Sequence, residues 1–340
     1  MMTIKKSLPN PCKGEYVVFV RTITYNHSGY IEECMDGVAK QETTFPFVQM
    51  VIDDASSDGS QEVIKNYVER EFDIDNANCY DNELALIIVG KHKKNNNYTI
   101  AAYLLKQNLY GNPKKEELYK PWRESSKYEA ICEGDDYWTV PNKLQIQVEF
   151  LESHIDYSAV ATQSMVIYET DKTPHPFSKQ LKDYDWKIGA LIGYRPFHTS
   201  TIMHRTNPEV YNRPKVYSGD ICLIVMLSQI GRWKFLSQNT CVYRKHSGGA
   251  SSNVTITDLQ KDLLAIPYYL KINPHFPKTK YRAYLYYTFS IFPPQNSVYN
   301  ILKYGIKSVV LNLICLPIDI SQILRTFYYM YLKLLNKVQK

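Results

Sequence analysis

Stretches of β-branched and aromatic residues alternate with amphipathic helical patterns through the first half of this 340-residue chain. Such stretches fit the pleated surface of a sheet, and four of them are Tyr16–Tyr25, Phe47–Asp54, Leu84–Gly90 and Tyr128–Cys132. Apolar residues with helical spacing follow the first, second and fourth of these stretches. This alternation predicts an α/β fold, with a mostly parallel sheet flanked by helices.

The second half mixes the same signals less regularly. Tyr157–Tyr168 and Phe197–Arg205 are predicted strands, and a helix is expected from Asp220 to Ile230, ended by Gly231. Two short strands, Trp233–Ser237 and Thr240–His246, are expected after it. We therefore expect one catalytic-type domain over residues 15–255 and a separate helical tail over residues 256–340.

Polar and acidic residues follow the predicted strands where each one ends. Tyr25 and Asn26 end the first strand, Asp53 and Asp54 the second, and Glu133–Asp136 follow the fourth. In open α/β sheets, ligands bind beyond the carboxyl ends of the strands. These three loops are therefore expected to converge on one crevice.

The sequence Glu133-Gly134-Asp135-Asp136 places three carboxyl groups within four residues. Like charges this close raise one another's pKa unless a cation compensates them. Mg²⁺ and Mn²⁺ prefer carboxylate and phosphate oxygens, so a metal–diphosphate site accounts for the crowding. An acid/base pair or a polar turn stays open at this point, and the pair Asp53-Asp54 also suits a simple turn.

Composition limits the compartment and the partners. The seven cysteines form no CxxC pair, which argues against zinc and for a reducing compartment. The N-terminus lacks the apolar run of a signal peptide, so a cytoplasmic location is expected. The first 255 residues show no basic stripe, zinc finger or RNA-binding signature, and no nucleic acid partner is expected.

The tail accounts for the net positive charge of the chain. Residues 256–340 contain eleven Lys and Arg against three Asp and Glu, and they mix these with Leu, Ile and Tyr. No uncharged run reaches the roughly 20 residues of a spanning helix. The pattern is typical of helices at a membrane surface, and packing on the catalytic domain or on another subunit is the equal alternative.

Three segments, in order, resemble the family 2 glycosyltransferases, which have the GT-A fold and use nucleotide-sugar donors. They are "TITYNHSGYIEECMDGVAKQETTFPFVQMVIDDASSDGS", "CEGDDYWTVPNKLQIQVEFLE" and "SGDICLIVMLSQIGRWKFLSQNTCVYRKHSGGAS". The resemblance spans roughly Tyr16 to Ser252. It implies an inverting transfer from a nucleotide sugar, expected to be UDP-linked, to a hydroxyl of a glycan or lipid-linked acceptor in cell-surface polysaccharide synthesis.

The resemblance assigns the nucleotide pocket to the first two strand ends. Asp53 would contact the uracil or the ribose, with Asp54 as its neighbour. Tyr25 and Asn26 would line the same pocket.

The resemblance also implies a divalent cation, Mn²⁺ or Mg²⁺, at the third strand end. Asp135 would be the principal ligand, and Asp136 would lie close to the ribose or the metal. Glu133 stands where the family more often has Asp, which puts its direct ligation in question. His246 would complete the metal shell or contact the diphosphate.

Two further roles follow from the third segment. Arg244 and Lys245 would add positive charge against the leaving group. Asp220, at the start of a helix, would be the general base, since a carboxylate there is favoured in its ionised form. Asp is also a good helix cap, and this chain has Gly219-Asp220 where the family usually has Glu-Asp.

Two other classes of protein stay open from the residues alone. A nucleotidyltransferase could use a similar sheet, although it would normally carry a Gly-rich phosphate loop that "TITYNHSGY" lacks. A non-catalytic sugar-binding or scaffold protein is the second alternative. The sequence does not name the sugar, the acceptor or the linkage.

Overall fold

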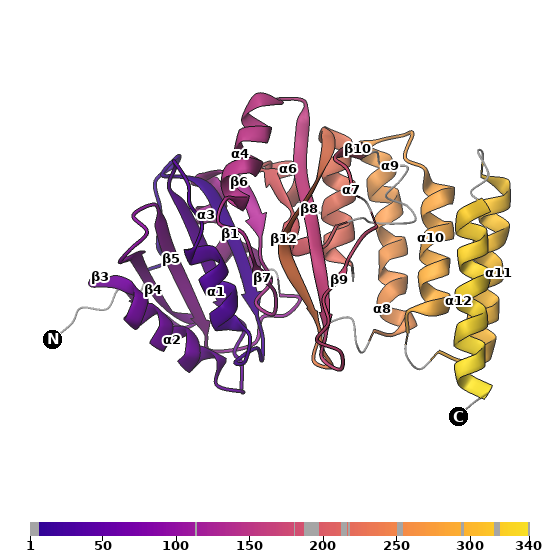
Figure 1. The fold of residues 1–340 in the computed structure, drawn as a ribbon, viewed down its shortest axis with the longest axis horizontal. Helices are drawn as coiled ribbons and strands as arrows, with labels where there is room; N and C mark the ends of the chain where they lie inside the picture. The colour runs from indigo at the N-terminus through magenta and orange to yellow at the C-terminus, as the bar shows by residue number, and fades with distance from the viewer. Residues whose placement is uncertain are drawn as a thin grey trace. The chain divides into compact units, whose positions relative to one another are not determined.

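The structure is a computed structural model (Figure 1). It describes residues 7–112, 114–179, 181–186, 197–211, 216, 218–249, 254–293, 296–315 and 320–338. The chain forms two compact units. The first comprises residues 1–185, 196–207 and 231–245, and the second comprises residues 186–195, 208–230 and 246–340. The predicted division at residue 255 stays a prediction, and each unit is described separately below.

Four parallel strands form the centre of the sheet in the first unit. Their order is β5-β2-β1-β6, where β1 is Tyr16–Thr24, β2 Phe47–Asp53, β5 Tyr98–Leu105 and β6 Ser126–Ile131. Every residue of β2 and β5 is buried, as expected for strands covered on both faces. The predicted strands at Tyr16, Phe47 and Tyr128 are confirmed.

Further strands, joined by both antiparallel and parallel pairings, extend both sides of this parallel centre. Beyond β5 lie β4 (Ala85–His92) and β3 (Phe72–Asp81). Beyond β6 lie β11 (Met203–Arg205), β8 (Tyr157–Tyr168), β12 (Arg232–Lys245) and β10 (Tyr184–Trp186). The short strands β7 (Tyr137–Trp138) and β9 (His175–Pro176) pair with β12 and β8. The sheet is therefore mixed, with a parallel centre.

Two features of this sheet differ from the expectation. The two short strands predicted between Trp233 and His246 are one strand, β12, with irregular register between Leu236 and Cys241. The polar residues at that irregularity made the sequence look interrupted. β5 was not anticipated, yet it separates β2 from β4.

Helices cover both faces of the parallel centre. On one face, α1 (Ile31–Ala39), α2 (Ser60–Glu71) and α4 (Lys143–Ser153) pack on inward side chains of the strands. On the other face, α3 (Lys114–Glu124) buries Leu118, Tyr119 and Trp122. This three-layer arrangement confirms the predicted α/β architecture.

The second unit is mainly helical. It contains α6 (Pro208–Tyr211), α7 (Gly219–Ile230), α8 (Ile256–Gln260), α9 (Ile266–Ile272), α10 (Lys278–Ile291), α11 (Val298–Ile314) and α12 (Ile320–Val338). An aromatic cluster of Tyr269, Phe276 and Tyr281 joins α9 to α10, with ring centroids 5.0 to 5.8 Å apart. The helical tail is confirmed. Within the described residues, none of the helices has both the length and the hydropathy that crossing a bilayer demands.

Gly37 lets α1 approach the loop that follows β6. A Cβ atom at this position would lie 2.8 Å from both the backbone nitrogen and the backbone oxygen of Trp138 in β7. Both obstacles are backbone atoms, so neither can rotate away. The close approach therefore requires glycine and holds α1 against the Cys132–Trp138 segment.

We predict that Gly37→Ala destabilises the chain by about 1–3 kcal/mol through overpacking. In a helix with free space at this position, Gly→Ala would stabilise the chain by up to about 1 kcal/mol. The sign of the change in unfolding free energy therefore shows whether the position is crowded. Urea unfolding measures it, with Gly29→Ala as the control because nothing lies within 4 Å of a Cβ there. A stabilised Gly37→Ala variant would contradict the packing.

Candidate active site

The loops after β1 and β2 are joined through a serine. The backbone N–H of Asn26 donates to Ser56 Oγ (2.8 Å), and Asn26 Oδ1 accepts from the N–H of Ser57 (2.9 Å). Ser56 in turn donates to both carboxylate oxygens of Asp53 (2.9 and 2.6 Å). Asn26 adopts a left-handed backbone, with φ of 57°, which asparagine tolerates better than most residues. The two predicted nucleotide loops therefore lie together.

Asp53 and Asp54 are both buried, and both have partners within the chain. Asp53 also accepts from Gln61 Nε2 (2.8 Å). Asp54 accepts from the N–H of Leu109 (2.7 Å) and forms an ion pair with Lys115 (2.6 Å). A nucleotide contact by Asp53 stays a prediction.

The acidic loop is pinned to β1 beyond the end of β6. The N–H of Cys132 donates to the carbonyl of Arg21 (3.0 Å), and the N–H of Gly134 donates to the carbonyl of Ile23 (2.9 Å). A Cβ on Gly134 would lie 2.6 Å from Thr24 Cβ. Glycine is required for this approach, and the loop therefore lies directly beside the end of β1.

Asp135 lies beside a histidine of the β1 loop. Its Oδ2 is 3.9 Å from His27 Nε2, and both side chains keep some exposure, 17% and 12%. Together they offer an oxygen and a nitrogen within reach of one cation. Carboxylate and imidazole form a donor set that suits Mn²⁺ better than Mg²⁺, which prefers oxygens. The predicted convergence of the three loops is confirmed by these contacts.

Asp136 points the other way, into the protein. Its carboxyl group accepts from Ser200 Oγ and from the N–H of Arg244 (3.0 Å), and it lies 3.2 Å from His198 Nδ1. Burial, reinforced by the charge of Asp135, raises the pKa of Asp136 well above the ordinary carboxyl range. Its role near the ribose or the metal stays a prediction.

Ser200 connects both ends of the acidic loop. Its hydroxyl accepts from the N–H of Glu133 (3.2 Å) while it donates to Asp136. Ser200 lies in a short 3₁₀ turn, η1 (Thr199–Thr201), in a stretch where the sequence predicted a strand. His198, which precedes the turn, stacks on Tyr243 at 3.8 Å between ring centroids.

The charge of Glu133 acts on Arg21, which is partly buried. Burial opposes the charged form of Arg21, but Glu129 and then Glu133 raise its pKa above the ordinary value. Arg21 Nε also donates to Glu129 (2.8 Å). The charge of Glu133 therefore acts on the interior as well as on the loop, and its metal ligation stays a prediction.

Arg244 and Lys245, the basic residues at the end of β12, also contact other residues of the chain. The Arg244 guanidinium donates to the backbone oxygen of Asp135 (2.8 Å), pairs with Glu33 and lies over the Tyr137 ring (4.3 Å). Lys245 Nζ lies over the Tyr168 ring, 5.6 Å from its centroid. Arg244 thus holds the acidic loop in place, and phosphate contact by either residue stays a prediction.

Asp220 and His246 belong to the second unit. Asp220 lies in the first turn of α7, as predicted. The start of this helix is held by Ser218, whose N–H and hydroxyl both donate to Asp262 (3.0 and 2.6 Å). His246 follows the last residue of β12. The catalytic role of Asp220 and the ligand role of His246 stay predictions.

Three residues of this site were not found from the sequence: His27, His198 and Ser200. The signal for His27 was its place directly after Asn26 at a strand end. No local signal marked His198 and Ser200, because they reach the acidic loop only through the pairing of β11 with β6.

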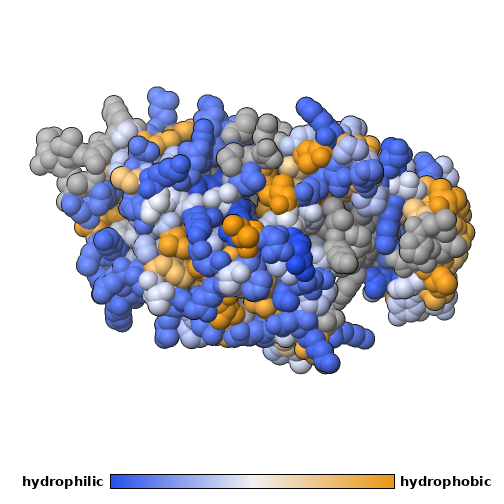
Figure 2. Space-filling view, turned by 90° about the horizontal axis from the view of Figure 1, so that it is seen from above, coloured by the Kyte–Doolittle hydropathy of each residue, from blue (hydrophilic) through white to orange (hydrophobic). Residues whose placement is uncertain are grey.

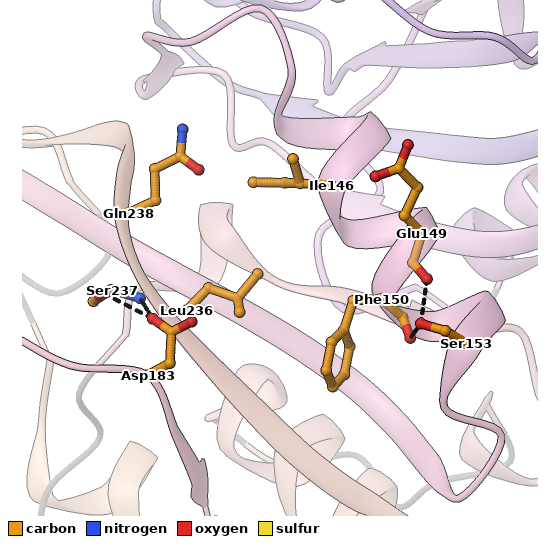
Figure 3. Close-up of a pocket in the computed structure, with 8 residues that line it drawn as sticks. All are labelled: Ile146, Glu149, Phe150, Ser153, Asp183, Leu236, Ser237 and Gln238. Atoms are coloured by element: carbon orange, nitrogen blue, oxygen red, sulfur yellow. Dashed lines mark hydrogen bonds between the residues drawn. The ribbon is translucent and has the colours of Figure 1, made fainter.

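A surface groove of about 600 Å³ lies between α4 and β12, outside these loops (Figure 3). Phe150, Ile146 and Leu236 supply its apolar lining, and Asp183 accepts from Ser237 at its edge. None of the predicted site residues lines it.

Known proteins resemble this chain both in sequence and in fold. Residues 19–82 match the model of glycosyl transferase family 2. Over these residues the chain is similar to that family. The matched residues run from β1 to β3 and contain the loops of Asn26 and Asp53, whereas the acidic loop, Arg244 and Asp220 lie outside them.

Relatives of this chain include uncharacterized proteins of Mycobacterium tuberculosis and Mycobacterium bovis. Each is 29% identical over 229 residues, which are 67% of this chain and 58% of the relative. The chain thus spans less than two thirds of the length of these relatives.

Two solved structures share its fold. Staphylococcus aureus TarS 1–349 in complex with UDP-GlcNAc has a TM-score of 0.57 and 17% identity, covering 88% of this chain and 83% of that one. The mannosyltransferase PcManGT of Pyrobaculum calidifontis, in complex with GDP-Man and Mn²⁺, has a TM-score of 0.51 and 15% identity, covering 97% and 84%. The fold is therefore of the GT-A type.

We predict that Ser200→Ala lowers the free energy of unfolding by about 1–3 kcal/mol, because it removes a donor from the buried carboxyl group of Asp136. Urea denaturation measures the change. Ser153→Ala is the matched control, since this exposed hydroxyl bonds only to carbonyls of its own helix and to His154. Equal stability of the two variants would contradict the role assigned to Ser200.

Proposed function

We propose that this chain is an inverting glycosyltransferase of family 2. It would transfer a sugar from a nucleotide donor, UDP-linked in the first instance, to a hydroxyl of a glycan or lipid-linked acceptor in cell-surface polysaccharide synthesis. The observation that carries the proposal is the position of Asp135. Its partly exposed carboxylate lies beside His27, at the strand end where the Asn26 and Asp53 loops meet.

Two proteins of similar fold support the class of donor. The TarS structure contains UDP-GlcNAc, and the PcManGT structure contains GDP-Man and Mn²⁺. In both, the ligand is a nucleoside diphosphate sugar. The base and the sugar differ between them, so UDP is our choice and GDP is the alternative that the test below separates.

Asp135 and His27 would hold a divalent cation, with Glu133 and His246 as further candidate ligands. Such an ion, Mn²⁺ or Mg²⁺, supplies positive charge against the diphosphate of the donor. The crowding of carboxyl groups suits this role, since Asp135 keeps some exposure while Asp136 is buried and hydrogen-bonded. The residues present therefore fit a cation.

The remaining roles belong to side chains of the chain itself. Asn26 and Tyr25 would orient the nucleotide, with Asp53 and Asp54 shaping the wall behind it. Asp136 and Arg244 would keep Asp135 in position, since both hold the loop from inside. Lys245 would add positive charge against the leaving group.

Asp220 would accept the proton of the acceptor hydroxyl as that oxygen attacks the anomeric carbon. The bond to the nucleotide diphosphate breaks on the opposite face, which inverts the configuration. A carboxylate at the start of a helix is favoured in its ionised form, as this step needs.

We predict metal-dependent binding of UDP by the purified full-length chain. Calorimetric titration of UDP should show binding with Mn²⁺, and Asp135→Ala should weaken it by at least about tenfold, or about 1.4 kcal/mol. Asp156→Ala is the matched control, because this carboxylate is exposed and pairs with Arg232.

The outcomes separate the parts of the proposal. Equal UDP binding with and without Mn²⁺ would contradict the proposed role of a metal in donor binding. Binding of GDP in place of UDP would change the base and leave the class of donor intact. Absence of binding for both nucleotides would contradict the transferase proposal and favour a scaffold role.

A further inference from the structure

The helix α11 turns an apolar stripe to solvent. Its members recur every three or four residues and therefore share one side of the helix. Their exposed fractions range from 39% to 68%, and they are Tyr299, Leu302, Ile306, Val310 and Leu313. A helix that belonged only to the core of the second unit would direct such residues inward.

The neighbouring helix α12 has a second stripe of the same kind. Its exposed residues are Ile320, Leu324, Phe327, Tyr328, Tyr331 and Leu335, at 37% to 65%. We call the two stripes together the tail face. Figure 2 shows hydrophobic residues gathered at the end of the view where Figure 1 places these two helices. Large exposed apolar patches mark sites of interaction.

The opposite sides of both helices are packed, so the tail face is a true outer surface of the pair. A Cβ on Gly305 of α11 would meet the Met330 side chain of α12. Ser308 of α11 donates to the carbonyl of Ala283 in α10 (2.8 Å). Tyr304 packs edge-on against Phe289 of α10, with ring centroids 5.4 Å apart. The inner sides are therefore already occupied by the tail itself.

The charges on these two helices have one sign. Neither helix contains Asp or Glu, and together they carry Lys303, Lys307, Arg325, Lys333 and Lys337. Lys303 lies over the rings of Tyr299 and Tyr304, at 5.3 and 5.4 Å. Positive charge thus lies next to the apolar stripe of α11. The tail face also contains three tyrosines, and tyrosine is enriched where protein meets lipid headgroups.

We propose that the tail face docks on an anionic lipid surface, with α11 and α12 lying in the plane of the headgroups. Apolar side chains would enter the acyl boundary, and Lys and Arg would meet lipid phosphates. A second copy of this chain is the less favourable occupant, because it would bring a surface of the same charge against this one. A spanning mode does not apply to the described helices, none of which is long and apolar enough.

This surface goes beyond the proposed glycosyl transfer. Binding to vesicles needs neither donor nor acceptor, so its failure and the failure of the transferase proposal can be told apart. If both hold, lipid docking would bring the chain to the surface where a lipid-linked acceptor resides.

Co-sedimentation of the full-length chain with vesicles tests the proposal. We expect binding to vesicles of phosphatidylcholine with phosphatidylglycerol and at least tenfold weaker binding to phosphatidylcholine alone. Lys303→Gln/Lys307→Gln should weaken binding by roughly fivefold for each charge removed, and added salt should weaken it further.

A pair of double variants isolates the apolar contribution. Ile306→Glu/Leu324→Glu should reduce the bound fraction at least tenfold. Ile155→Glu/Leu181→Glu adds the same charge at residues that are 89% and 84% exposed in the first unit, and it should bind like the wild type. Circular dichroism melting checks that both variants are folded.

Three results would overturn the proposal. The first is equal binding to neutral and anionic vesicles, and the second is no binding to either. The third is self-association, measured by sedimentation velocity without lipid, that Ile306→Glu/Leu324→Glu abolishes while vesicle binding is absent. That result would assign the tail face to a second copy of the chain.

Discussion

Two backbone hydrogen bonds beyond the end of β6 determine where the acidic loop lies. The N–H groups of Cys132 and Gly134 donate to carbonyls of Arg21 and Ile23, so the loop continues along β1 after the regular ladder has ended. Backbone groups at such a position must be paired when they are buried. Gly134 makes the approach possible, because any side chain would collide with Thr24. The position of Asp135 next to the β1 loop follows from this pairing.

The neighbouring carboxyl groups of Asp135 and Asp136 point in different directions. Asp136 turns inward to Ser200, His198 and the N–H of Arg244, whereas Asp135 keeps partial exposure beside His27. The buried carboxyl group is satisfied by donors on η1 and β12, two segments remote in sequence. Asp136 therefore serves to hold the loop, and we propose that Asp135 is the group that meets a ligand. At β2 both carboxyl groups are buried instead: Asp53 accepts from Ser56 and Gln61, and Asp54 accepts from Leu109 and pairs with Lys115.

Three of the four strands in the parallel centre, β1, β2 and β6, could be predicted because their residues carry strong local signals. Tyr16–Thr24 and Phe47–Asp53 are rich in β-branched residues, and each is followed by an amphipathic helix. β5 was missed because its sequence, YTIAAYLL, is apolar except for Thr99, and such an apolar run does not separate a buried strand from a helix. β12 was divided in two because Ser237–Asn239 interrupt its pattern at the irregular register.

The candidate site could be predicted only in part, for a related reason. The sequence alone shows which acidic residues follow a predicted strand, and Asp53 and Asp135 were proposed as site residues on that basis. Side chains such as Ser200 and His198 reach the loop through an antiparallel pairing of β11 with β6, which no local pattern encodes. Ser200 and His198 hold Asp136 together with the N–H of Arg244. No pattern in the sequence indicates that this buried acid has these three partners.

We propose that Asp135 holds a cation for a nucleotide that binds on the β1 and β2 loops. A crystal structure grown with UDP and Mn²⁺, with anomalous diffraction data to locate the metal, tests it most directly. We predict an anomalous peak beside the Asp135 carboxylate, with UDP against Asn26. UDP bound to these loops with no manganese at Asp135, or manganese bound elsewhere in the chain, would contradict the account.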